Sequence, residues 1–139
     1  MAGISVREEG MPTIQRFEEL VAWQKARELT REVYLVTAEG KFARDYGLAG
    51  QIQRASVSIM ANIAEGFERG NRAEFHQFLS VAKASCAEVR SHLYVAMDVR
   101  YISPDEGTRL QSIAEEVTRI VAGLRKAVEK QRDEQRGKK

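Results

Sequence analysis

The residues best suited to acid–base, nucleophilic or metal chemistry are two histidines and one cysteine. His76 and His92 are 16 residues apart, which places them about 160° apart around a helix, so they cannot bind one metal ion from the same face. Cys86 falls on an apolar stripe, and no histidine lies close enough in the sequence to activate its thiol. Phosphate-binding glycine loops, nucleophile elbows, HExxH motifs and CxxC pairs are absent from the sequence. We therefore predict a protein that is not an enzyme and uses no metal, cofactor or small-molecule substrate.

A second group of polar residues follows one side of the stretch from residue 51 to residue 70. On a helix its members fall within roughly 80° of one another, and we call them the polar stripe: Gln51, Arg54, Ser58, Asn62, Glu65 and Arg69. Such a stripe is commonly a solvated face. Its short or planar groups also fit a polar contact with another helix, or hydrogen bonds to phosphates and base edges. The sequence leaves these three interpretations open.

Specific roles can be assigned to the stripe as hypotheses. Arg54 and Arg69, together with Arg72 just beyond the stripe, are candidate nucleic-acid-binding residues, since phosphates are bound mainly by arginine and lysine. In an oligomer, several subunits would combine these arginines into a basic ring. The candidates for a polar contact between helices are Gln51, Ser58, Asn62 and Glu65.

Charge is unevenly distributed along the chain. The net charge is +2, but residues 125–139 contain seven Lys or Arg against three Asp or Glu. The tail therefore carries +4 and the rest of the chain −2. A body that is not basic argues against a broad nucleic-acid surface on one subunit. The tail serves solubility or acts as a weak nucleic-acid arm.

Apolar periodicity predicts the helices that must position these groups. The first helix runs from about residue 15 to residue 38, and the central one carries apolar residues over roughly 200° of its circumference. Asn71, with Glu74 three residues later, predicts the start of a third helix that reaches about Tyr101. Ser103 and Pro104, followed by Glu106, form a capping-box start for a one-sided fourth helix.

Four helices with short connections and no β-type alternation predict an all-α fold, an antiparallel up-down-up-down four-helix bundle. We expect residues 1–13 to be a flexible lead, residues 14–128 to form the bundle, and residues 129–139 to be a disordered charged tail.

Apolar residues outside the core stripes predict contacts between subunits. Val81, Val95 and Val99 lie off the main stripe of the third helix, and Trp23 and Tyr34 lie on a flank of the first. For the first helix, the alternative is that this flank is the edge of a wide core face. We take all five residues as candidate oligomer contacts.

Composition is typical of a soluble helical protein, with 43% hydrophobic and 30% charged residues and two prolines. No apolar run approaches the roughly 20 residues of a membrane span, and the first residues do not resemble a secretory signal. We therefore expect a cytoplasmic protein with no membrane partner. A single cysteine permits no disulfide within the chain.

The segment QIQRASVSIMANIAEGF, which begins at Gln51, resembles the signature of a bacterial four-helix-bundle family. Members of this family include proteins encoded within intervening sequences of 23S ribosomal RNA genes. The segment FEELVAWQKA at residues 17–26 is similar to the family's opening helix, and residues 75–102 are similar to its third. The likeness covers about residues 14–125.

The resemblance implies a bundle that assembles into a homo-oligomeric ring, with a pentamer as the typical form. Related bundles serve as accessory proteins of reverse-transcriptase retroelements. Our leading hypothesis is a non-enzymatic homo-oligomer that binds structured RNA, such as ribosomal RNA. The alternatives are a protein-interaction scaffold that binds no nucleic acid and a retroelement accessory factor.

Overall fold

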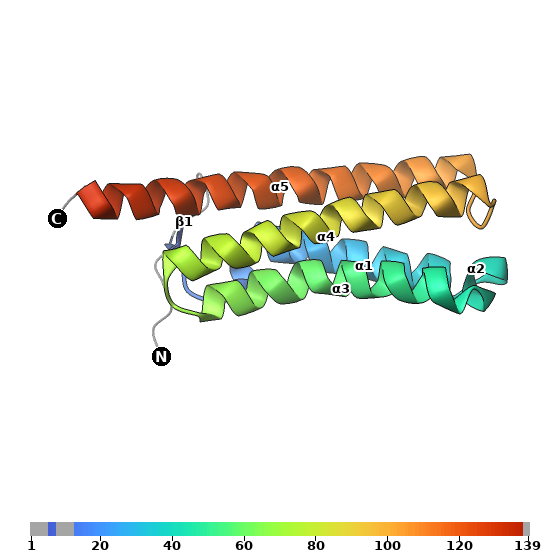
Figure 1. Cartoon of the computed structure of the whole chain (residues 1–139), viewed down its shortest axis with the longest axis horizontal. Helices are drawn as coiled ribbons and strands as arrows, with labels where there is room; N and C mark the ends of the chain where they lie inside the picture. The colour runs from blue at the N-terminus through green and yellow to red at the C-terminus, as the bar shows by residue number, and fades with distance from the viewer. Residues whose placement is uncertain (1–5, 8–12, 138–139) are drawn as a thin grey trace.

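The computed structural model describes residues 6–7 and 13–137. Figure 1 shows long helices lying side by side along one axis. In chain order the elements are β1 Val6–Arg7, β2 Thr13–Ile14, the 3-10 helix η1 Phe17–Glu19, α1 Val21–Thr37, α2 Gly40–Arg44, α3 Tyr46–Glu68, α4 Arg72–Asp98 and α5 Pro104–Gly137. The all-α fold predicted from the sequence is confirmed.

The four long helices form a closed cycle around one core. Helix α3 packs against α1 and α4, and α5 packs against α4 and α1. The connections between successive long helices are short, so neighbouring helices run in opposite directions, as the sequence predicted (Figure 1). Helices α1 and α4 therefore lie at opposite corners of the bundle.

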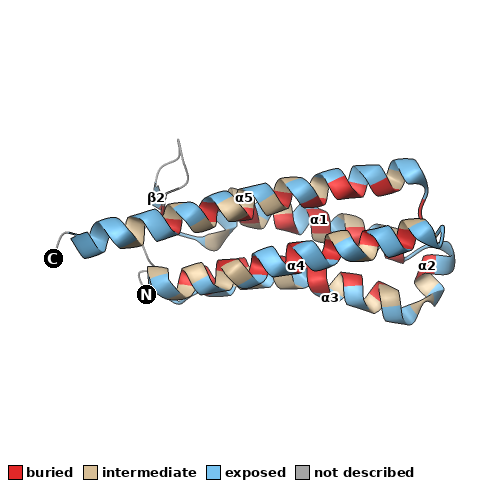
Figure 2. Ribbon diagram, turned by 45° about the horizontal axis from the view of Figure 1, so that its top comes forward, coloured by how far each residue is buried: buried red, intermediate tan, exposed pale blue. Residues whose placement is uncertain are grey.

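The core is a stripe of buried aliphatic and aromatic side chains along each long helix (Figure 2). On α3 it includes Ile52, Ile59, Ile63 and Phe67, each at most 1% exposed. One residue of the apolar arc expected on α3 does not join this core. Val57 is 40% exposed, because it lies on the outer side of α3 where no neighbouring helix covers it.

The helix starts follow the predicted caps. The Asn71 side chain accepts a hydrogen bond from the Glu74 amide at 2.8 Å, and the Ser103 hydroxyl accepts one from the Glu106 amide at 3.1 Å. Between α3 and α4, Gly70 adopts a φ of +80°, a conformation that glycine takes without a Cβ penalty. These local signals mark the turn before α4 and the turn before α5.

The ends of the chain differ from the expectation. Helix α5 continues to Gly137, whereas the apolar pattern ended it near Val128, and its last turns extend past the other helices (Figure 1). Within the expected flexible lead, Val6 and Arg7 pair with Ile14 and Thr13 in a short antiparallel ladder, and Val6 is buried. The rest of that lead, residues 1–5 and 8–12, lies outside the described residues, as do residues 138–139.

The connection after α1 is more ordered than the sequence suggested. Residues 40–44 form α2, and the fully buried Phe42 ring lies 5.3 Å from the ring of Tyr101 between centroids. Tyr46, the other aromatic residue near this connection, is 84% exposed. Phe42 alone of the two aromatics anchors the connection to the bundle end.

Candidate functional site

A groove of about 260 Å³ separates the outer edges of α3 and α4, and we call it the α3–α4 groove. Its lining residues are Gln51, Arg54, Ala55 and Ser58 from α3 and Ser85, Glu88 and His92 from α4. Half of the predicted polar stripe therefore faces this groove. His92 and Glu88 were not predicted as site residues, because nothing in their spacing marks them without knowledge of which face of α4 meets α3.

The floor of the groove is a hydrogen-bonded contact between the two helices. The hydroxyls of Ser58 and Ser85 lie 2.9 Å apart. The Asn62 side-chain amide donates to the Ser58 carbonyl at 2.8 Å and to its hydroxyl at 3.0 Å. Among the interpretations of the polar stripe, a polar contact between helices therefore describes Ser58, whereas the hydrogen bonds of Asn62 stay within α3.

The rim of the groove carries charged groups that are not neutralised within the subunit. Arg54 and Gln51 are exposed, and no hydrogen bond or ion pair of Arg54 occurs within the described part of the chain. Glu88 lines the same groove without a salt bridge among the described residues. Arg54 is therefore a cation available to a partner.

The other two candidate arginines are already engaged. Arg69 contacts Glu65 at 3.1 Å, and its guanidinium lies 5.1 Å from the centre of the Phe78 ring. Arg72 donates to Gln135 at 2.8 Å and to Gln131 at 3.4 Å, both on the last turns of α5. Within one subunit the three arginines do not form one cluster, since Arg54 and Arg69 are 15 residues apart, or about 22 Å along α3.

The candidate oligomer contacts divide between two surfaces. Val81, Val95 and Val99 are 49%, 44% and 50% exposed, and their spacing places them within about 40° on the outer edge of α4. We call these three residues the α4 valine edge. Tyr34 is also exposed but lies on α1, at the opposite corner of the bundle.

Trp23 occupies a different environment from the other candidate contacts. Its ring packs edge-on against Phe17 at 5.2 Å and is partly buried against the core. This placement agrees with the edge of a wide core face, which was the alternative to a subunit contact.

The two histidines and the cysteine lie in three different environments. His76 faces α5, with its Nε2 atom 3.8 Å from a Glu129 carboxylate oxygen, whereas His92 faces α3. In the described part of the chain, no three His, Cys, Asp or Glu side chains are grouped so as to hold a metal ion. Cys86 is fully buried, and this burial raises the pKa of its thiol to about 11, so the thiol is a poor nucleophile.

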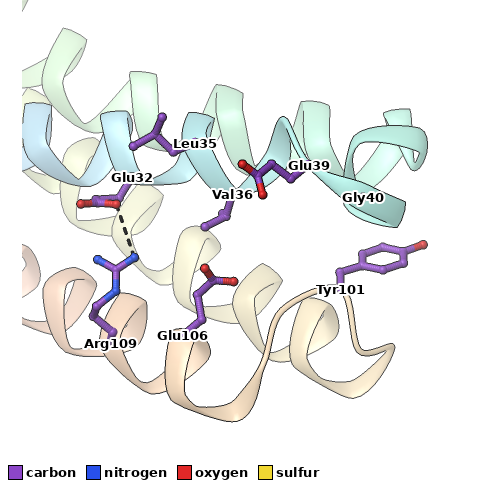
Figure 3. Close-up of a pocket in the computed structure, with 8 residues that line it drawn as sticks. All are labelled: Glu32, Leu35, Val36, Glu39, Gly40, Tyr101, Glu106 and Arg109. Carbon is purple, nitrogen blue, oxygen red and sulfur yellow. Dashed lines mark hydrogen bonds and ion pairs between the residues drawn. The ribbon is translucent and has the colours of Figure 1, made fainter.

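A pocket of about 400 Å³ lies between α1 and α5 at the end of the bundle near α2 (Figure 3). Three carboxylates line it, from Glu32, Glu39 and Glu106, and Arg109 contacts Glu32 at 3.4 Å. This pocket was not predictable from the sequence, because its residues come from segments about 70 positions apart.

The comparisons with known proteins agree with this architecture. The fold defines a four-helix-bundle protein. None of the helices in the described part of the chain combines the length and the hydropathy of a membrane span. The model of the family described as "23S rRNA-intervening sequence protein" matches residues 18–123. The chain therefore belongs to this family, as the resemblance of the central segment predicted.

A solved structure supports the fold. It is described as a protein with unknown function from the S23 ribosomal protein family of Bacteroides thetaiotaomicron VPI-5482. It superposes with a TM-score of 0.70 at 24% sequence identity, and the match covers 76% of this chain and 96% of the other. No curated protein sequence matches the chain. Neither the family description nor this structure names a catalytic activity.

Proposed function

We propose that the protein is a non-enzymatic scaffold that assembles into a homo-oligomer through the α4 valine edge. The observation that carries this proposal is the position of Val81, Val95 and Val99. All three are about half exposed, while the core beneath them is complete without them. Three valines on one helix edge bury apolar surface only if another molecule covers them.

A closed ring of more than two copies requires two different surfaces on each subunit. We assign the second surface to the C-terminal turns of α1, where Tyr34 and Leu35 are 46% and 52% exposed. Helices α1 and α4 lie at opposite corners of the bundle, so each subunit can contact two neighbours at once. Five copies is the number that the family resemblance favours.

Native mass spectrometry at micromolar concentration tests this assignment. We expect the wild-type chain to give a single closed oligomer, and a Val95→Lys, Val99→Lys variant to give smaller species, because each lysine would have to be desolvated in the contact. Tyr94→Lys is the matched control. Tyr94 is 56% exposed on the same helix but points about 100° away from Val95.

The second proposed function is binding of structured RNA. Arg54, exposed on the rim of the α3–α4 groove without a partner in the described residues, supports it, and so does the family's description, which refers to a 23S rRNA intervening sequence. In an oligomer, Arg54 recurs once per subunit and multiplies the phosphate contacts. An RNA partner also implies a cytoplasmic location.

A salt-dependent titration of a labelled stem-loop RNA tests this second function. We expect Arg54→Ala to lower the affinity several-fold and to reduce the salt dependence. Arg69→Ala is the control, because Arg69 is already paired with Glu65. Equal effects of the two substitutions on RNA affinity would show that Arg54 is not part of the binding surface. Absence of RNA binding at low salt would favour the scaffold without nucleic acid.

A further inference from the structure

A second feature of α1 is unrelated to either proposed surface. A pocket of about 310 Å³ lies on the N-terminal half of this helix and is lined by Trp23, Gln24, Arg27, Glu28 and Arg31. We call it the Trp23 pocket. All of its lining residues come from about three turns of one helix.

The indole ring in this pocket is contacted by an aromatic ring and by a guanidinium group. Phe17, from η1, contacts it edge-on with ring planes at 65°. The Arg27 guanidinium carbon lies 5.6 Å from the ring centre, within the range of a cation–π interaction. Trp23 and Arg27 therefore present two planar groups, one over the other, at the protein surface.

The lining of this pocket carries two guanidinium groups against one carboxylate, Glu28. Glu28 shares Lys25 with Glu116, at 3.4 Å and 3.5 Å, and the nearby Glu32 contacts Arg109 at 3.4 Å. Arg27 and Arg31, in contrast, take part in no ion pair within the described part of the chain. Two uncompensated guanidinium groups thus lie one turn apart beside an aromatic ring.

We propose that the Trp23 pocket binds unpaired nucleotides of single-stranded RNA. A base stacks on the Trp23 ring or on the outer face of the Arg27 guanidinium, and the flanking phosphates contact Arg27 and Arg31. Gln24 donates its side-chain amide to the Glu18 carbonyl at 2.8 Å, which leaves its side-chain oxygen to accept from a base edge. This inference rests on the proposed RNA-binding function and assigns it a second surface.

The chemistry of the pocket favours single strands over duplexes. In an A-form duplex the bases are stacked on one another and their faces are not accessible to a side chain. Stacking on an aromatic group is tolerant of sequence, because every base has a π face. The pocket therefore predicts binding to loops, bulges and ends of a folded RNA.

Trp23 is the single tryptophan of the chain, so its fluorescence reports directly on the pocket. We would titrate the full-length protein with a 20-nucleotide oligo(A) RNA and, separately, with a 20-base-pair RNA duplex. Fluorescence anisotropy of labelled RNA would measure affinity in parallel. We expect oligo(A) to quench the Trp23 emission and the duplex to leave it unchanged.

An Arg27→Gln, Arg31→Gln variant should bind oligo(A) about tenfold more weakly, since two phosphate contacts are lost. Arg119→Gln is the matched control, because Arg119 is an exposed arginine of α5 with no salt bridge among the described residues; it should bind as the wild type does. Circular dichroism would verify that each variant retains its helices.

The outcomes separate this inference from the function on which it rests. If the protein bound the labelled stem-loop RNA but oligo(A) did not quench the Trp23 fluorescence, the Trp23 pocket would not be a binding site for single-stranded RNA. The proposed RNA-binding function would still hold. Equal oligo(A) affinity of the double variant and the wild type would overturn the Trp23 pocket as well. Absence of binding to every RNA at low salt would overturn both.

Discussion

The side-chain hydroxyls of Ser58 on α3 and Ser85 on α4 lie 2.9 Å apart at the floor of the α3–α4 groove. Ser85 is only 4% exposed, so its hydroxyl has little access to water. Loss of one such hydrogen bond costs about 1 kcal/mol. We expect Ser85→Ala to lower the free energy of unfolding in urea by this amount. Ser91→Ala, at an exposed position of the same helix, should change it by less than about 0.5 kcal/mol; equal losses would contradict this role of Ser85.

Two helical glycines should respond to alanine with opposite signs. A Cβ atom at Gly66 would lie 2.5 Å from the Phe78 Cβ and 3.0 Å from the Phe75 ring, whereas one at Gly123 would meet nothing within 4 Å. We expect Gly66→Ala to destabilise the protein by about 2 kcal/mol through overpacking. Gly123→Ala should stabilise it by about 0.5–1 kcal/mol through helix propensity. Thermal unfolding of both variants checks the pair, and a shift of the same sign in both would refute it.

Asp45 should make stability depend on acid pH. Its carboxylate accepts hydrogen bonds from the Leu48 amide at 3.0 Å and the Tyr101 hydroxyl at 2.9 Å, and these bonds lower the pKa of Asp45. The stabilisation that these hydrogen bonds give the folded state is therefore complete above the pKa of Asp45 in the unfolded chain, about 3.9. It is lost as the pH falls through the lower pKa that Asp45 has in the folded protein.

We expect the stability of the wild type to fall more steeply than that of Asp45→Asn as the pH is lowered from 6 to 3, since asparagine caps a helix without titrating. Urea midpoints at pH 6, 4 and 3 measure the difference. If the urea midpoints of the two proteins fell in parallel, Asp45 would not contribute to the pH dependence of stability.

Cys86 should be inert in the folded protein. Burial raises the pKa of its thiol to about 11, while a cysteine in an unfolded chain titrates near about 8.5. We expect alkylation by iodoacetamide at pH 8 to be more than about 100-fold slower in native protein than in 8 M urea. Mass spectrometry of the alkylated fraction over time gives both rates, and comparable rates would mean that the α4–α5 contact opens readily.

Helix positions were predictable where local chemistry determines them. Asn71 and Ser103 cap their helices as expected, because a capping side chain bonds to an amide only three residues away. The extension of α5 to Gly137 was missed, because its last turns carry no apolar stripe. There, Arg72 bonds to Gln131 and Gln135 across 59 and 63 positions of sequence, a contact that periodicity does not encode.

The candidate site was predictable only in part for the same reason. The 3.6-residue repeat grouped Ser58 with Asn62 on one face of a helix, and the structure joins them by a hydrogen bond. It did not reveal that Ser85 and His92 face them from α4, since the rotation of one helix against another depends on the whole core. The Glu65–Arg69 pair has the i,i+4 spacing that a sequence can show, whereas the contact of Arg69 with the Phe78 ring cannot be read from spacing, because Phe78 lies on another helix.

The mass of the native assembly tests the central proposal most directly. In sedimentation-equilibrium experiments at micromolar concentration, we expect one closed species for the wild type, with five times the chain mass as the favoured value. We expect smaller species for Val95→Lys, Val99→Lys and an unchanged assembly for Tyr94→Lys. A wild-type protein that sediments as a stable monomer would contradict it, as would a valine-edge variant that assembles as the wild type does.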